Sequence, residues 1–392
     1  MHVTSLLLTN FRNFRHLDLR LSPHVTVVLG DNAQGKTNLL ESVYLLATTK
    51  SHRASTDREL VNQSVLQDDL PFCRVCAEVE RSRGMLKLDM SLVLETPALA
   101  GAPVRPEEPS RPVSVRKRLR LNGVGRRAAN VVGQVNVVMF TAEDVQLVSG
   151  APSLGRRYLD LVSCQIDPEY TRRLQRYNRV LLQRNHLLRS IQEHRARPDQ
   201  LDFWDGDLAE NGSYVVTKRQ RLAAELSAMA SGIHEELTGR AAEFQLTYET
   251  NVPLPGGFAE PEPRYHQALD QARNREIAQG MTLVGPHRDS IHFFVDGMDM
   301  ARYGSRGQQQ TVAVALRLAE ARYMEGQVGD APILLLDDVF AELDRVRRQH
   351  LLAAIGAYQQ VLITATDLEC FEPSFLDRAD MLRVREGTVQ PV

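Results

Sequence analysis

Eight consecutive residues near the N-terminus have the types and the spacing of a phosphate-binding loop. They are Gly30, Asp31, Asn32, Ala33, Gln34, Gly35, Lys36 and Thr37, which fit the pattern G-x-x-x-x-G-K-[ST]. Glycines let backbone N–H groups approach phosphate oxygens, and a helix that begins there adds partial positive charge. Lys36 would neutralise the β- and γ-phosphates, and the Thr37 hydroxyl would bind Mg²⁺. The loop therefore predicts a site for ATP and Mg²⁺.

A second group of candidate residues follows an apolar run late in the chain. Ile333 to Leu336 would form a buried strand, with Asp337 and Asp338 at its end. A phosphate loop needs a carboxylate on the metal side, so Asp337 is the expected Mg²⁺ partner. Asp338 would be catalytic, like Lys36, by orienting or polarising an attacking water. The alternative is that the two aspartates only form a helix cap or a surface turn.

A third group stands where a helix over residues 307–324 is expected to begin. Ser305, Gly307 and Gln308 place a serine and a glycine at a helix N-terminus, which is an arrangement that binds anions. By itself this segment would be interpreted as a capped helix without a ligand.

The elements that must position these groups follow from periodicity and turn residues. Strands are expected at residues 3–8, 11–21 and 24–29 before the loop, and a helix at 37–48 after it. Strand-like alternation covers 72–94 and 131–140, interrupted by a proline-rich stretch at 97–112 typical of a loop or linker. The pattern is helical from 154 to about 239. Helices at 307–324 and 345–357 alternate with strands at 333–336 and 360–364, and Asp344 could cap the second of these helices.

Composition limits the function classes only weakly. The chain has 392 residues, 43% of them hydrophobic and 24% charged, which is typical of a globular protein with two or three domains. Its net charge of −2 gives no global attraction to an anionic partner, so any basic patch must be local. No apolar run approaches the ~20 residues that cross a bilayer, and we expect a cytoplasmic protein without a membrane partner. Cys73 and Cys76 lack a second pair for zinc and are expected in a buried strand.

One segment has a marked local excess of positive charge. Residues 113–127 contain no acidic residue and turn at Asn122-Gly123, which predicts a basic β-hairpin. Its basic residues are candidates for contact with the phosphates of an anionic partner: Arg116, Lys117, Arg118, Arg120, Arg126 and Arg127. The arginines of the helical region are further candidates, although a solvated surface is the alternative for each of them.

The order of these motifs resembles that of the ATP-binding-cassette ATPases of the chromosome-maintenance and Rad50 type, and more narrowly the RecF family of DNA replication and repair proteins. The resemblance extends over nearly the whole chain. It includes the segments Leu8–Asn13, Phe140–Asp144, Arg156–Asp160, Thr282–Asp289 and Leu335–Asp344. Thr364-Ala365-Thr366 departs from the cassette pattern because it contains no histidine, and Asp338 is shorter than the glutamate of many cassette ATPases.

The resemblance implies an α/β fold, a P-loop ABC-type ATPase head with a mixed β-sheet and a helical insertion or arm domain. Residues 1–150 and 280–392 would form the head, and residues 151–279 the insertion. ATP would lie between two subunits, with the phosphate loop of one facing Ser305 to Gln308 of the other, and Arg12 would reach the phosphates. We expect an ATP-dependent homodimer that hydrolyses ATP slowly and binds single-stranded or gapped DNA. With recombination-mediator partners, it would support recombinase loading and SOS induction.

Two other function classes share parts of this pattern. The ATPase subunit of a membrane transporter has the same loop and serine-bearing helix, but it is usually smaller and lacks a long helical insertion here. A small-molecule kinase uses the same loop, replaces the Ser305 segment by an acceptor pocket, and could act as a monomer. DNA-stimulated ATPase activity and ATP-dependent dimerisation would distinguish a DNA-binding ATPase from both of these classes.

Overall fold

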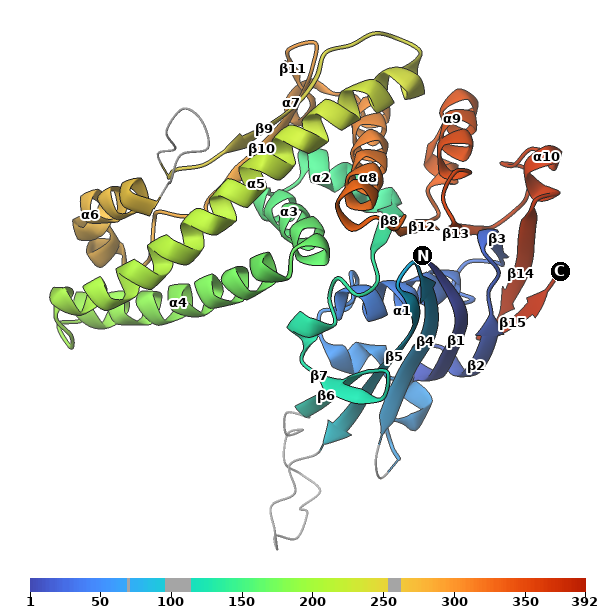
Figure 1. The fold of residues 1–392 in the computed structure, drawn as a ribbon, viewed down its shortest axis with the longest axis horizontal. Coiled ribbons are helices and arrows are strands. Elements are labelled where there is room, and N and C mark those ends of the chain that lie inside the picture. The colour runs from blue at the N-terminus through green and yellow to red at the C-terminus, as the bar shows by residue number, and fades with distance from the viewer. Residues whose placement is uncertain (69–70, 96–113, 253–261) are drawn as a thin grey trace, which may run out of the picture. The chain divides into compact units, whose positions relative to one another are not determined.

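The computed structural model describes residues 1–68, 71–95, 114–252 and 262–392 (Figure 1). The chain divides into two compact units, which we call unit 1 (Met1–Ala142 and Met324–Val392) and unit 2 (Glu143–Tyr323). Residues 143–150 and 280–323, which the sequence analysis assigned to the head, fall in unit 2, where strand β10 pairs with β9. The proline-rich stretch at 97–112 lies outside the described residues.

Both units mix helices and strands. The strands are β1 (His2–Phe11), β2 (Phe14–Arg20), β3 (His24–Leu29), β4 (Phe72–Arg81), β5 (Gly84–Glu95), β6 (Ser114–Leu121), β7 (Val124–Arg126), β8 (Val137–Thr141), β9 (Phe244–Glu249), β10 (Ser290–Val295), β11 (Met298–Asp299), β12 (Ile333–Asp337), β13 (Gln360–Ala365), β14 (Ala379–Arg385) and β15 (Thr388–Pro391). The helices are α1 (Lys36–Thr48), α2 (Val145–Ser149), α3 (Pro152–Ile166), α4 (Pro168–Gln192), α5 (Leu201–Thr238), α6 (Glu262–Gln279), α7 (Met300–Tyr303), α8 (Arg306–Val328), α9 (Arg345–Ile355) and α10 (Pro373–Leu376).

Unit 1 contains two six-stranded sheets. The antiparallel sheet has the order β2-β1-β4-β5-β6-β7, and the mixed sheet has the order β15-β14-β3-β13-β12-β8. Helix α1 contacts β4 and β5 of the first sheet and β12 and β13 of the second. A helix covered by two sheets must be apolar on nearly every side, and eleven of its thirteen residues are buried.

The mixed sheet joins the two ends of the chain at its centre. Strand β3, which leads into the phosphate loop, runs parallel to β13 and β14, and β13 runs parallel to β12. Ile333 to Leu336 of β12 are fully buried, as expected for a central parallel strand covered on both faces. The carboxyl ends of β3 and β12 therefore lie at one edge of the sheet, where Thr37 and Asp337 meet.

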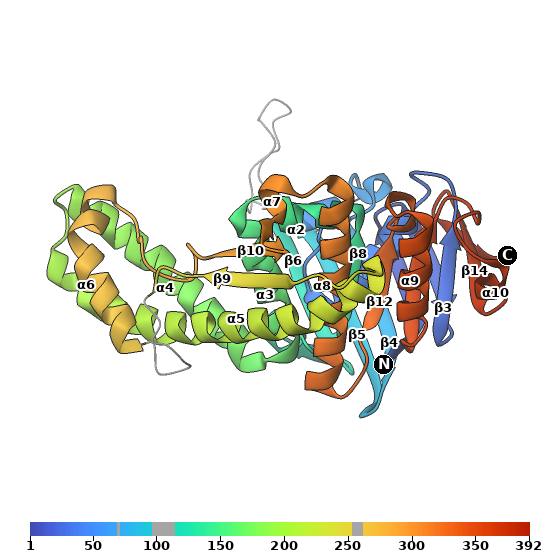
Figure 2. The ribbon, with the colours of Figure 1, turned by 90° about the horizontal axis from the view of Figure 1, so that it is seen from above.

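Unit 2 is mainly helical. The long helices α4 and α5 pack against each other, and α6 packs against both (Figures 1 and 2). A three-stranded sheet of order β11-β10-β9 packs on α5 through β9. The unit encloses an apolar core between the helices, to which Tyr177, Leu208 and Tyr265 contribute fully buried side chains.

Most elements expected from periodicity are confirmed, with shifts of a few residues at their ends. The expected strand at 131–140 is too long, since only Val137–Thr141 is extended. Cys73 and Cys76 are buried in β4, which confirms the strand interpretation. Within the described ranges, no three His, Cys, Asp or Glu side chains are grouped as metal ligands. Strands β9, β14 and β15 had no counterpart among the expected elements.

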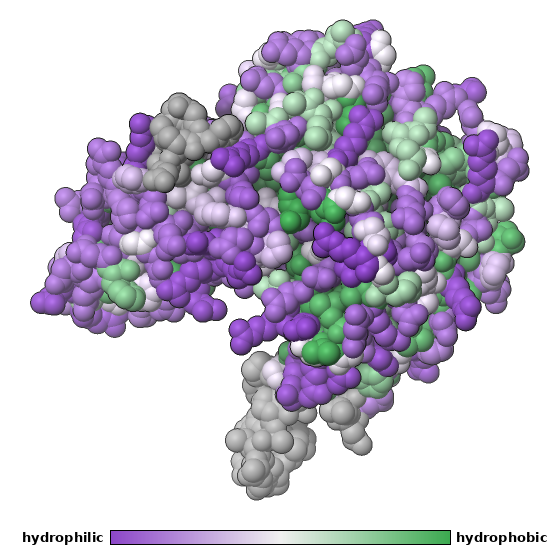
Figure 3. Space-filling model, viewed as in Figure 1, coloured by the Kyte–Doolittle hydropathy of each residue, from purple (hydrophilic) through white to green (hydrophobic). Residues whose placement is uncertain are grey.

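The visible surface is largely hydrophilic, as the space-filling view shows (Figure 3). Among the described helices, none combines the length and the apolar character needed to cross a membrane.

Candidate nucleotide site and basic hairpin

The phosphate loop connects β3 to α1, the context that its sequence pattern requires. Ala33 and Gly35 have positive φ angles of 64° and 118°, so the chain turns sharply before the helix begins. Gly30 packs against β14, where a Cβ on residue 30 would lie 2.5 Å from the carbonyl oxygen of Val384. A larger residue at this position would push β14 away from the loop.

The Lys36 side chain folds back over this loop. Its Nζ donates hydrogen bonds to the carbonyl oxygens of Gly30 at 2.5 Å and Asp31 at 3.0 Å. Burial lowers the pKa of Lys36, and the charges of Asp338 and Asp337 oppose this shift. Both aspartates are therefore close enough to act electrostatically on the lysine.

Thr37 and Asp337 meet although 300 residues separate them. The Thr37 hydroxyl donates to Asp337 Oδ1 at 2.9 Å, and the Thr364 hydroxyl donates to the same oxygen at 2.9 Å. Burial raises the pKa of Asp337, and the hydrogen bonds from both threonines oppose this shift. A hydroxyl and a carboxylate are oxygen donors of the kind that Mg²⁺ prefers, and Mg²⁺ needs only one or two of them from protein. Thr37 and Asp337 therefore fit the role of its protein ligands.

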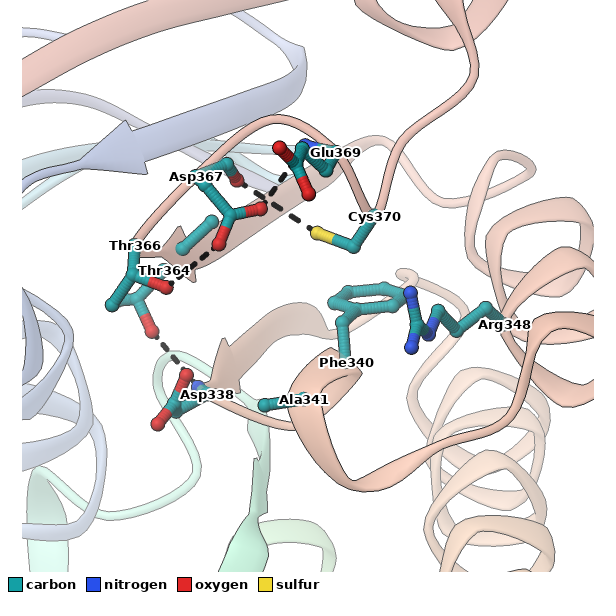
Figure 4. A pocket seen from close by; sticks show the side chains of 10 residues that line it. Asp338, Phe340, Ala341, Arg348, Thr364, Thr366, Asp367, Glu369 and Cys370 are labelled. Atoms are coloured by element: carbon teal, nitrogen blue, oxygen red, sulfur yellow. Dashed lines mark hydrogen bonds between the residues drawn. The ribbon is translucent and has the colours of Figure 1, made fainter.

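Asp338 follows in a different backbone conformation. Its φ of 55° lies in the left-handed region, and its N–H donates to the Thr364 hydroxyl at 2.9 Å. Asp338 lines a cavity of about 300 Å³ between the segments Phe340–Ala341 and Thr364–Cys370 (Figure 4). Neighbouring aspartates thus have separate environments, one bound to Thr37 and the other beside an open cavity.

Arg12 is held by a buried carboxylate. Its guanidinium donates two hydrogen bonds to Glu41 of α1, at 2.9 and 2.8 Å, and a third to the carbonyl oxygen of Glu59. Burial alone would raise the pKa of Glu41, but the hydrogen bonds from Arg12 and Ser51 outweigh it, so that pKa is lowered. The structure places Arg12 beside the phosphate-loop helix and engages its side chain with Glu41.

Ser305 stands in unit 2 at the start of α8. Gln308 N–H donates to the Ser305 hydroxyl at 3.3 Å, and the Gln308 side chain accepts a hydrogen bond from Ser305 N–H at 2.8 Å. The two residues form a reciprocal cap, as the capped-helix interpretation expects. Ser305 is exposed, and Gly307 lies in the first turn of α8.

The basic segment forms the expected hairpin, β6 and β7, and its charges point to two faces of the sheet. Arg116, Arg118 and Arg120 alternate along β6 and are exposed. Lys117 points to the opposite face, where its Nζ donates to Asp57 at 2.9 Å and to the carbonyl oxygen of Thr49 at 2.8 Å. Arg126 pairs directly with Leu119 and therefore shares the face of Lys117. The six candidate DNA contacts are not one continuous patch.

Four of these arginines have no acidic partner within the described part of the chain. They are Arg118, Arg120, Arg126 and Arg127, whereas Arg116 contacts Glu95 at 3.3 Å. Arg118 lies directly opposite Ser91 of β5, and Arg120 opposite Asp89. Asp89 is engaged by Arg74, at 2.7 and 3.0 Å. Among the described residues, Arg118 and Arg120 on the outward face of β6 therefore have no carboxylate of their own.

Comparison with known proteins identifies the family. Residues 2–389 match the model of the RecF/RecN/SMC N-terminal domain. The DNA replication and repair protein RecF of Chloroflexus aurantiacus is 43% identical over 99% of both chains, and that of Herpetosiphon aurantiacus is 42% identical over 100% of both. The chain belongs to the RecF family.

Solved structures support the same assignment. A structure described as the recombination mediator protein RecF-ATP in the RecFOR pathway shares 27% identity and a TM-score of 0.85, covering 100% of this chain and 97% of that one. An Smc head domain derived from Pyrococcus furiosus has a TM-score of 0.53 at 13% identity, over 100% of this chain and 96% of that one, so it shows the fold alone. The predicted fold class, an α/β ABC-type ATPase head with a mixed sheet, is confirmed.

Two residues near the candidate nucleotide site escaped the sequence analysis. Thr364, which bonds both Asp337 and the backbone of Asp338, lies in the segment noted only for its missing histidine. The charge of Arg53 opposes the upward shift that burial gives the pKa of Asp337, so this arginine is close enough to act on that carboxylate. Neither residue belongs to a local motif, since each is brought to the site by the pairing of the strands or by the loop after α1.

His287, to which the sequence analysis gave no role, is part of a buried polar network in unit 2. Its Nδ1 lies 2.6 Å from the hydroxyl of Tyr177 and its Nε2 lies 3.1 Å from the carbonyl oxygen of Thr282. Burial lowers the pKa of His287 to about 4. With both ring nitrogens engaged, the residue fixes the loop before β10.

Proposed function

We propose that this protein is an ATP-dependent DNA-binding protein of DNA replication and recombinational repair. The observation that carries the proposal is the contact of Thr37 with Asp337 at the end of the phosphate loop, in a chain of the RecF family. The full-length similarity to RecF relatives favours it over a transporter subunit or a small-molecule kinase. No observation specifically favours either alternative.

The proposed nucleotide chemistry uses the residues at the edge of the mixed sheet. Backbone N–H groups of residues 30–37 cradle the β-phosphate, and Lys36 leaves the Gly30 and Asp31 carbonyls to bind the β- and γ-phosphates. Thr37 and Asp337 would hold Mg²⁺, which would supply neutralisation of phosphate charge when bound. Asp338 orients a water molecule for attack on the γ-phosphorus and accepts its proton, releasing ADP and phosphate.

ATP would also join two copies of the protein. Ser305 and Gly307 of a second copy would offer the positive N-terminus of α8 to the γ-phosphate, with Gln308 holding the cap. Because hydrolysis removes the group that holds the copies together, slow turnover would time the release of the dimer. We expect a rate below about 10 s⁻¹, the median for enzymes in general.

The proposed substrate is single-stranded or gapped DNA. The exposed arginines Arg118 and Arg120 would contact backbone phosphates, which gives affinity that depends on salt but little on sequence. By similarity to RecF proteins, one of whose structures is described as a recombination mediator in the RecFOR pathway, the partners would be further mediator proteins. Recombinase loading and SOS induction would be the outcome in the cell.

Light scattering in solution tests the proposal. The mass of the wild type is measured with and without Mg·ATP and a gapped DNA, beside Lys36→Met and Ser305→Arg. Ser149→Arg, which changes another exposed serine of unit 2, is the matched control. We expect an ATP-dependent dimer that DNA strengthens, that the first two variants lose and that the control keeps. A wild type that binds ATP and stays monomeric with DNA present would contradict the shared site.

A further inference from the structure

The phosphate loop is braced from outside by a side chain of the antiparallel sheet. Asn13, in the turn between β1 and β2, donates a hydrogen bond from its amide nitrogen to the carbonyl oxygen of Gln34 at 2.7 Å. Its amide oxygen accepts a hydrogen bond from Asn38 of α1 at 2.8 Å. One side chain therefore connects the loop to the helix that follows it.

Gly35 lies directly against this amide. A Cβ on residue 35 would lie 2.5 Å from the amide nitrogen of Asn13, and Gly35 has a φ of 118°, which side chains rarely adopt. The glycine thus serves two purposes, a backbone turn toward phosphate and room for the asparagine behind it.

The C-terminal hairpin holds the same point of the loop. The N–H of Glu386 donates to the Gln34 side chain at 2.7 Å, and the N–H of Gly387 donates to the Gln34 carbonyl oxygen at 3.3 Å. A Cβ on Gly387 would lie 2.4 Å from the carbonyl oxygen of Asn13, so the two turns touch each other over the loop. Gln34 is therefore held by both sheets of unit 1.

We propose that Asn13 is a positioning residue for nucleotide binding: its amide fixes the Gln34 carbonyl outward, so that the N–H groups of the loop point inward to phosphate. Backbone groups can bind an anion strongly only when their orientation is set before the ligand arrives. The inference rests on the proposed nucleotide function, and it assigns the orientation of the loop to a residue outside the loop motif.

Two substitutions of Asn13 test whether its hydrogen bonds, and not merely the size of its side chain, support nucleotide binding. Asn13→Leu keeps the approximate shape and removes both hydrogen bonds, and we expect it to weaken the binding of Mg·ADP and Mg·ATP about tenfold at every pH. Asn13→Asp replaces the donor by an acceptor that repels the Gln34 carbonyl oxygen. Its affinity for both nucleotides at pH 8 should fall at least as far as that of Asn13→Leu, because an ionised carboxylate has no proton to donate.

Calorimetric titration of the full chain with Mg·ADP and with Mg·ATP between pH 5.5 and 8 measures these affinities. The segments packed against Asn13 carry the charged residues Arg12, Asp31, Lys36, Glu41, Arg385 and Glu386, and the wild type titrated in parallel corrects for them. Arg15→Leu, in the same hairpin with its side chain on Ser64, is the control and should bind like the wild type.

Several results would overturn the assignment. Wild-type affinity in folded Asn13→Leu would do so, and so would wild-type affinity at pH 8 in folded Asn13→Asp. If these variants do not fold, Asn38→Ala removes only the second hydrogen bond, and unchanged affinity there would count against the brace. A wild type that binds neither nucleotide would instead reject the proposed function.

Discussion

Two regions of this molecule are rich in arginine, and they differ in whether the arginine charge is paired with carboxylates. In unit 2, Arg184, Arg219 and Arg317 are each placed against two carboxylates. Arg184 contacts Asp205 and Glu276, Arg219 contacts Asp160 and Asp289, and Arg317 contacts Asp144 and Glu320. In the hairpin of unit 1, Arg118 and Arg120 are exposed and have no acidic partner among the described residues.

The difference is one of purpose. A buried guanidinium must be paired because an isolated charge in a protein interior is very costly, so the arginines of unit 2 hold helices together. An exposed, unpaired arginine costs little and keeps its field available to an anion. Arginine content alone therefore does not identify a surface for nucleic acid, and we expect the unpaired arginines of the hairpin, not the paired ones of unit 2, to meet an anionic partner.

The largest effect should come from a buried arginine. Arg184 is fully buried in α4 and also donates to the Thr282 hydroxyl at 2.9 Å. Arg184→Met leaves Glu276 without its cation and Asp205 with Arg273 as its remaining partner. We expect a loss of about 3–5 kcal/mol in the free energy of unfolding, measured with urea. Arg179→Met, on an exposed position of the same helix, should cost less than about 0.5 kcal/mol. Equal losses in the two variants would contradict the contrast.

Buried charge should also make the stability of unit 2 depend on pH. Burial raises the pKa of Glu320 from 4.5 to about 7, with the Arg317 guanidinium opposing the shift. Between these values the folded state keeps a proton that the unfolded state has released, so stability falls as pH rises from about 4.5 to 7 and then levels off. Glu320→Gln should remove this loss of stability, which is on the order of 3 kcal/mol between pH 4.5 and 7.

Urea denaturation at several pH values measures this slope. Glu236→Gln is the matched control, because Glu236 is 61% exposed and pairs with Arg322 on the surface. A slope that survives in Glu320→Gln would mean that another group of the protein is responsible.

The same contrast separates the features that could be predicted from the sequence from those that could not. The phosphate loop, the Asp337-Asp338 pair and the alternating hairpin are local patterns, and the elements that carry them are found where they were expected. The ion-pair or hydrogen-bond partner of a side chain depends on contacts between distant segments of the chain. A local sequence pattern therefore does not reveal it. The contact of Lys117 with Asp57, of Arg12 with Glu41, and of Thr364 with Asp337 arise only when the sheets pair around α1.

DNA binding by the β6–β7 hairpin should depend on salt concentration, whereas the stability of unit 2 should depend on pH. The double variant Arg118→Glu, Arg120→Glu should weaken binding of gapped DNA about 10- to 100-fold at 0.1 M salt and lower the slope of log K against log salt by about 2. The unfolding free energy should change by less than about 0.5 kcal/mol.

The control for this double variant is an equal charge reversal in α4. Arg172 and Arg176 are exposed there but engage Glu169 and Asp207. Arg172→Glu, Arg176→Glu should leave the salt slope unchanged in fluorescence-anisotropy titrations. If the α4 variant lowers the slope and the hairpin variant does not, the DNA surface lies on the helical unit instead.

The smallest effect separates two faces of one strand. Lys117 lies between Arg116 and Arg118 in the sequence, yet only 20% of its side chain is exposed and its ammonium group holds Asp57 and the carbonyl oxygen of Thr49, the residue that caps α1. Lys117→Met should cost about 1 kcal/mol of stability, because it leaves a half-buried carboxylate and a helix-end carbonyl without a donor. It should not change the salt slope of DNA binding, since this ammonium group is committed to unit 1.

Arg116→Met, on the outer face and paired among the described residues with exposed Glu95, should cost almost nothing. A salt slope lowered by Lys117→Met as much as by Arg118→Met would show that both faces of β6 meet DNA, and the distinction between paired and unpaired cations would then fail within this one strand.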